Sequence, residues 1–138
     1  MNQAEKAELL EQIEKWNDAD EFARCIEAIE SIPEQERDYL LTLKLGRAYS
    51  NLAVLGDHGA LGENAEVDGD LLRHAIDLLE SVRTQGENDP YWAMFFYYGN
   101  GYWWKKGIPA QPENMDAYFA LEKQIMEKHH LKEPFEWE

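Results

Sequence analysis

Apolar residues recur at helical spacing along most of this chain, and polar or helix-breaking residues separate the runs. In the first 55 residues large apolar side chains return every three or four positions, which predicts amphipathic helices. Pro33 ends the second helix, because proline lacks the backbone N–H that a helix interior requires. The predicted ranges are 3–16, 20–31 and 35–55.

A glycine-rich stretch then interrupts the helical pattern. Residues 56–69 hold four glycines and no sustained period, so we expect a loop. Either Asp68 or Asp70 is placed to cap a fourth helix, since a side-chain oxygen just before the first turn accepts a free backbone N–H. Gly86 is expected to end that helix.

Residues that favour the starts and ends of helices also define the remaining helices. Asp89 followed by Pro90 predicts the start of a fifth helix, because proline is favoured at the first helical position behind a capping residue. This helix is expected to run to Trp104, and a sixth to span 113–129. An aromatic tail follows at 131–138.

Two short segments share one pattern of large apolar residue, glycine, two variable residues and tyrosine. They are LGRAY at 45–49 and YGNGY at 98–102, and their glycines lie 99 − 46 = 53 positions apart. A period of this size is typical of stacked helical arrays, in which one unit cannot bury its apolar face alone. We therefore expect an all-α fold in one domain over 1–138, built as an α-α superhelix of three helix-turn-helix hairpins. Their expected ranges are 3–33, 35–85 and 90–129.

The pattern resembles that of the tetratricopeptide repeat (TPR) family, in a bacterial-type, degenerate three-repeat form. The matching positions are Leu45, Gly46, Tyr49, Ala75, Leu79 and Val82 in the second repeat, Phe95, Tyr98, Gly99 and Tyr102 in the third, and Ala28 and Pro33 in the first. The resemblance implies that Gly46 and Gly99 each let the following helix approach closely. It also implies that Tyr49 and Tyr102 are buried, and that a concave groove is lined by the first helices of the hairpins.

Charge and composition narrow the classes of partner. The chain has 28 acidic and 13 basic side chains, for a net charge of −15. That balance opposes binding to nucleic acids and to anionic membrane surfaces, and it is compatible with a basic protein partner. The most apolar stretch, 91–104, is shorter than the roughly 20 residues that a membrane-spanning helix needs. With the single Cys25 and no secretory signal, we expect a cytoplasmic protein.

Signatures of catalysis and of metal binding are absent from the sequence. Residues 64–70 imitate the start of a calcium-binding loop, but Ala75 stands where the bidentate glutamate is required. His129 and His130 are adjacent, so on a helix they point in different directions and cannot chelate one ion. We therefore predict a protein that is not an enzyme and that has no cofactor and no metal.

The fifth helix is unusually aromatic. Nine of the chain's 17 aromatic residues lie between Tyr91 and Trp104, on all sides of the predicted helix. Such a helix is covered on every side, by the chain's own core, by a second subunit or by a ligand. Combined with the groove that the resemblance implies, this gives the predicted partner-binding residues Lys44, Arg47, Asn51, Phe96, Asn100, Trp103 and Trp104.

These observations predict a non-enzymatic protein–protein interaction module that binds a peptide or protein partner. An immunity-type antagonist of a basic protein would fit the acidity of the chain. The alternative is a self-associating structural protein that uses the aromatic fifth helix as a homodimer seam.

Overall fold

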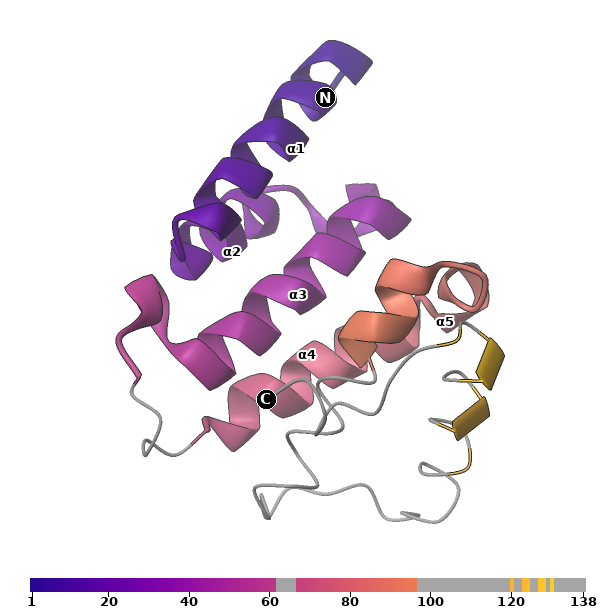
Figure 1. The fold of residues 1–138 in the computed structure, drawn as a ribbon. Helices are drawn as coiled ribbons and strands as arrows, with labels where there is room; N and C mark the ends of the chain where they lie inside the picture. The colour runs from indigo at the N-terminus through magenta and orange to yellow at the C-terminus, as the bar shows by residue number, and fades with distance from the viewer. Residues whose placement is uncertain (62–66, 97–119, 121–122, 125–126, 129, 131–138) are drawn as a thin grey trace.

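The computed structural model describes residues 1–61, 67–96, 120, 123–124, 127–128 and 130, and within these the fold is all-α (Figure 1). No strand occurs in this part of the chain. Residues 90–96 are also helical and follow the last labelled helix. The labelled elements are α1 (Gln3–Asp18), α2 (Phe22–Glu30), η1 (Glu34–Glu36), α3 (Tyr39–Leu55), η2 (Asp57–Gly59), α4 (Gly69–Ser81) and α5 (Arg83–Gly86).

Side-chain caps fix where four of these helices begin. In each, an Asn or Asp oxygen accepts a backbone N–H of the first turn, at 2.8 to 3.1 Å. Asp68, and not Asp70, caps α4. The predicted start of the third helix at residue 35 is wrong, because residues 34–36 form the separate 3-10 turn η1 and Asp38 caps α3. The four capping residues are Asn2, Asp38, Asp68 and Asp89.

Helices α3 and α4 form an antiparallel hairpin (Figure 1). The Asp68 amide donates to the Ala53 carbonyl at 3.0 Å, so the chain returns to the end of α3 before α4 starts. Further along the hairpin, a Cβ at Gly46 would lie only 3.0 Å from the Leu79 side chain, as the sequence predicted for this glycine. Its counterpart Gly99 lies outside the described residues.

Tyr49 is half-buried, so the prediction that it is buried is correct only in part. Its hydroxyl donates to the Glu30 carboxylate at 2.7 Å, and its ring meets His74 edge-on with 4.5 Å between centroids. The tyrosine thus connects α2, α3 and α4. The corresponding Tyr102 lies outside the described residues.

Helix α3 belongs to two hydrophobic cores, one on each side of it. The first core joins α3 to α4 and to residues 90–96, and the second joins it to α1 and α2. Since both sides of α3 are packed, the helix is held in place, and with it the backbone positions from which the side chains of its remaining face project. The first core contains Leu43, Ala53, Leu72, Ile76, Leu79, Val82, Trp92, Ala93 and Phe96, and the second contains Ile13, Cys25, Ile26, Ile29, Leu41, Leu45 and Ala48.

The start of the connection between α3 and α4 is bonded to the first hairpin. The His58 amide donates to the Asp20 carbonyl at 2.7 Å, and the Asp57 carboxylate accepts the Ala23 amide at 3.1 Å. Asp57 thereby caps α2, whose own N-cap residue Glu21 makes no side-chain cap hydrogen bond. The loop predicted over 56–69 thus contains the short 3-10 turn η2 at residues 57–59, and it ends one residue earlier than predicted, because Gly69 already belongs to α4.

The helical segment 90–96 is fixed against α4 by its inner face. Gly86 lies so close to the Trp92 ring that a Cβ there would come within 2.3 Å of it. The Trp92 indole N–H donates to the Leu79 carbonyl at 2.8 Å, and the ring stacks on Phe96 with 4.9 Å between centroids. Residues 83–86 form the short helix α5, so the fourth helix ends earlier than the predicted Gly86. Within the described residues no helix is long and apolar enough to cross a membrane.

Candidate functional site

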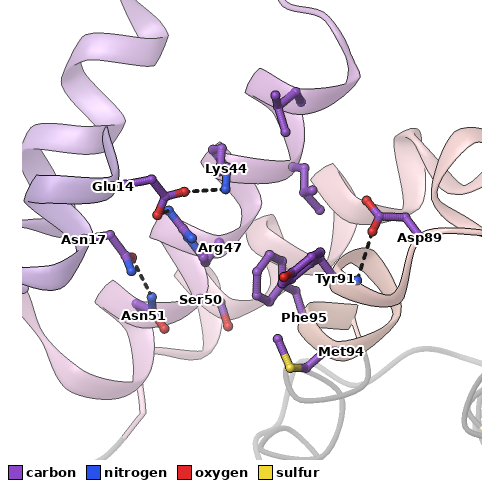
Figure 2. Close-up of a pocket in the computed structure, with 12 residues that line it drawn as sticks. Glu14, Asn17, Lys44, Arg47, Ser50, Asn51, Asp89, Tyr91, Met94 and Phe95 are labelled. Atoms are coloured by element: carbon purple, nitrogen blue, oxygen red, sulfur yellow. Dashed lines mark hydrogen bonds and ion pairs between the residues drawn. The ribbon is translucent and has the colours of Figure 1, made fainter. Parts of the chain in front are cut away.

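A pocket of about 860 Å³ lies between α1, α3 and residues 90–96 (Figure 2). Every described lining residue comes from the first helix of a predicted hairpin, or from the Asp89 cap that starts the third such helix. The lining residues are Glu14, Asn17, Leu40, Leu43, Lys44, Arg47, Ser50, Asn51, Asp89, Tyr91, Met94 and Phe95.

Helical spacing explains why these side chains share one pocket. On α3 the lining positions are 40, 43, 44, 47, 50 and 51, which recur every three or four residues and form one stripe. The same spacing places residues 14 and 17 together on α1, and residues 91, 94 and 95 together on the helical segment 90–96. The pocket is therefore formed by three helix faces, and only some of the side chains on these faces belong to the two hydrophobic cores.

One end of the pocket is cationic. Lys44 and Arg47 project from α3 toward Glu14 of α1, and both pair with its carboxylate (Figure 2). The Lys44 ammonium is hydrogen-bonded to Glu14 Oε1, and Arg47 Nη2 lies 3.0 Å from Oε2. Burial raises the pKa of the Glu14 carboxyl, but the Lys44 and Arg47 cations outweigh it and the pKa is lowered overall. Glu14 is thus held as a carboxylate.

Two of the three nitrogens of the Arg47 guanidinium have no hydrogen-bond acceptor among the described residues. Its side chain is only 13 % exposed, and within the described part of the chain its Nε and Nη2 groups have no hydrogen-bond acceptor. Arg47 Cζ also lies 5.8 Å from the centre of the Phe95 ring, which attracts a cation to its face. Buried N–H groups normally have partners, so these two are ready to bind an added acceptor.

Two asparagines lie beside the cations. Asn51 Nδ2 donates to Asn17 Oδ1 at 3.2 Å and so connects α3 to α1 (Figure 2). An amide has two donor hydrogens and an acceptor oxygen, so this single bond leaves both side chains with further capacity. Amide groups of this kind can bind the backbone of an extended peptide.

The opposite wall of the pocket is apolar and ends at Asp89. Tyr91, Met94 and Phe95 extend into the space from the helical segment 90–96, facing the α3 stripe (Figure 2). The Tyr39 hydroxyl and the Tyr91 amide both donate to the Asp89 carboxylate, at 2.5 and 3.0 Å. The pocket therefore has a cationic end, an apolar wall and an anionic end, which is already hydrogen-bonded.

The structure brings together three of the predicted partner-binding residues, Lys44, Arg47 and Asn51. The prediction for Phe96 is wrong. Its side chain is fully buried in the core with α4, because Trp92 and Phe96 lie one helical turn apart on the inner face. The remaining three predicted residues, Asn100, Trp103 and Trp104, lie outside the described residues.

Sequence reasoning missed the contribution of the first hairpin. Glu14 and Asn17 lie on α1, where the repeat pattern is degenerate and gave no groove positions. Tyr91 and Phe95 were also missed, although their spacing of four residues is a signal for one helix face. The signal in α1 is weaker, because a polar pair at i and i+3 occurs on most exposed helix faces.

Comparison with family models, with characterised protein sequences and with solved structures gave no match. In the described part of the chain no three His, Cys, Asp or Glu side chains are grouped so that they could hold a metal ion. The pocket is therefore interpreted from its own residues.

Proposed function

We propose that the chain is a protein-binding module of TPR-like helical hairpins, which acts without catalysis and receives a peptide segment of a partner protein in the pocket between α1, α3 and residues 90–96. The observation that supports this most strongly is the origin of the lining residues. Three successive first helices contribute to one concave space, as expected for an array that binds along its inner surface.

The size and lining of the pocket also support a peptide ligand. About 860 Å³ is within the roughly 300 to 1,000 Å³ that ligand pockets enclose. The lining combines an apolar wall for side chains with amides for a peptide backbone and charged groups at both ends. Tyr91, which is 65 % exposed, is a large anchor at the rim.

The charge of the whole chain supports a basic partner. A net charge of −15 attracts cationic proteins at long range and accelerates their association at low salt. An antagonist of a basic protein, of the immunity type, remains our preferred biological role. A reducing cytoplasm is the preferred location, in keeping with the single free Cys25.

Self-association is the second candidate, because Tyr91 on the aromatic segment is exposed. Trp92 and Phe96 of that segment are buried in the chain's own core, which leaves fewer aromatic side chains for a dimer seam. Sedimentation velocity over a hundredfold range of concentration separates the two candidates. We expect a monomer throughout, and a dimer that Tyr91→Ala disrupts would favour the alternative.

Selection from a random peptide library displayed on phage tests the proposed function. Selected peptides should bind the wild-type chain one to one in calorimetry. Lys44→Met and Tyr91→Ala should each weaken that binding by about tenfold or more, as expected for central contacts. Lys15→Met is the matched control, because Lys15 is an exposed lysine of α1 outside the pocket lining. Peptides that bind all variants equally, or a selection that yields none, would count against the proposal.

A further inference from the structure

We infer that the Glu14 carboxylate is an internal competitor, which occupies the cationic end of the pocket until a carboxylate of the ligand displaces it. This inference rests on the proposed function, since it specifies which chemical group of a bound peptide the pocket selects. It identifies Glu14 as the residue that sets affinity for an acidic ligand.

The charges at this end of the pocket are not balanced. Lys44 and Arg47 carry two positive charges, and their ion pairs in the described part of the chain are both with Glu14. The other carboxylate of the lining, Asp89, is hydrogen-bonded to the Tyr39 hydroxyl and the Tyr91 amide. One positive charge in the Lys44–Arg47 pair is therefore available to an anion from outside.

Exposure shows which partner of the ion pairs can move. The Lys44 and Arg47 side chains are 18 % and 13 % exposed and belong to α3, which is packed on two sides. The Glu14 side chain is 42 % exposed at the rim of the pocket. Glu14 can therefore turn into water, where a carboxylate is well solvated, while the two cations stay in place.

A ligand carboxylate can satisfy donors that Glu14 does not. Arg47 Nη2 is within ion-pair distance of Glu14, but neither Nη2 nor Nε has a hydrogen-bond acceptor in the described residues. A guanidinium binds a carboxylate best through two parallel N–H bonds, and a free ligand can approach in that orientation. The exchange replaces a poorly aligned internal contact with a better aligned one.

The surroundings of Arg47 indicate what should accompany the ligand carboxylate. The Phe95 ring lies against the guanidinium, and Met94 and Tyr91 continue the same wall. An aromatic or large apolar group one or two bonds from the carboxylate would cover this wall while the anion meets Lys44 and Arg47. The ligand class is therefore a peptide segment in which an acidic group adjoins an aromatic or large apolar side chain.

Phenylacetate is a small probe with both features, and phenylacetamide is its neutral counterpart. Each is titrated by NMR into the wild-type chain, into Glu14→Gln and into the control Glu11→Gln, whose glutamate is an exposed residue of the same helix paired with Lys15. Glutamine keeps the shape of Glu14 and removes its charge. We expect phenylacetate to bind Glu14→Gln about tenfold more tightly than wild type, with shifts at the Arg47 Nε–H and Phe95 signals. Glu11→Gln should behave as wild type, and phenylacetamide should not distinguish the three proteins.

Glu14→Asp is a second variant. The aspartate side chain is one methylene shorter, so its carboxylate reaches Lys44 and Arg47 less closely. The affinity of this variant for phenylacetate should therefore lie between those of wild type and Glu14→Gln. Equal binding of phenylacetate to wild type and Glu14→Gln would overturn the inference, as would an equal gain for phenylacetamide. Peptides selected from the library that occupy the pocket but carry no acidic group would also overturn it, and would leave the proposed function intact. A tenfold gain for Glu14→Gln without any selected peptide would support the anion site and count against the proposed function.

Discussion

The close packing of Trp92 on Gly86 holds one wall of the pocket in place, and Gly86→Ala perturbs it directly. A Cβ at this position would lie 2.3 Å from Trp92 Cγ and 2.5 Å from Cδ1 and Cδ2. Ordinary carbon contacts begin near 3.4 Å, so the ring would have to retreat by 3.4 − 2.3, or about 1 Å. Trp92 is fully buried and stacked on Phe96, which leaves it no open space to enter.

The cost of this retreat can be assembled from three contributions. Overpacking a buried core costs about 1 to 3 kcal/mol, and losing the bond from the Trp92 indole to the Leu79 carbonyl costs about 1 kcal/mol more. Alanine gains up to about 1 kcal/mol over glycine in a helix, which offsets part of that loss. We expect Gly86→Ala to lower the free energy of unfolding by about 1 to 3 kcal/mol, and the melting temperature by about 3 to 12 °C.

Gly46→Ala is the matched control for this prediction. Its Cβ would meet the Leu79 side chain at 3.0 Å, so this side chain would have to move by only a few tenths of an ångström. The expected loss is about 1 kcal/mol or less, because helix propensity again favours alanine. Urea denaturation followed by tryptophan fluorescence measures both variants. If Gly86→Ala stays within about 0.5 kcal/mol of wild type, Trp92 is not packed on Gly86 and the position assigned to the wall is wrong.

Two further predictions concern contacts between the hairpins. Asp57→Ala removes the acceptor for the Ala23 amide, so it should lower the free energy of unfolding in urea denaturation by about 1 kcal/mol. Asp57→Asn keeps an acceptor oxygen and should lower it much less. Equal losses in the two variants would exclude the cap. Burial and the Glu30 carboxylate raise the pKa of Tyr49 to about 12 from its usual 10, so the native state holds this proton more tightly. That stabilisation is complete below pH 10 and is lost between pH 10 and 12. The free energy of unfolding of wild type should therefore exceed that of Tyr49→Phe by less at pH 11 than at pH 9. A difference that stays constant over this range would refute the prediction.

Helix positions followed from the sequence because the signals for them are local. The apolar period of α3 and the Asp89 cap are properties of neighbouring residues, and the structure has them as predicted. Of the two caps predicted for α4, the structure uses Asp68. The boundary near residue 35 failed because two signals compete there. Residues 34–36 can continue a helical pattern, but Asp38 accepts the Leu41 amide, and α3 starts at Tyr39, four residues after the predicted start.

The contents of the pocket could be predicted only in part, since they depend on contacts between distant residues. Lys44, Arg47 and Asn51 share one face of a single helix, so periodicity was enough to group them. Glu14 meets them from 30 or more positions earlier, across a packing geometry that periodicity does not specify. Phe96 was misplaced for the same reason. Which face of an aromatic helix points inward is decided by the space beside Gly86, and not by the aromatic pattern itself.

An NMR map of where a library-selected peptide contacts the chain tests the proposed binding pocket most directly. We expect the largest changes in amide and side-chain signals at Arg47, Asn51 and Phe95 around the pocket. Signals of the outer residues Glu27 on α2 and Asp77 on α4 should change little. Changes centred on those outer residues, with the pocket unaffected, would show that the peptide does not bind in the pocket.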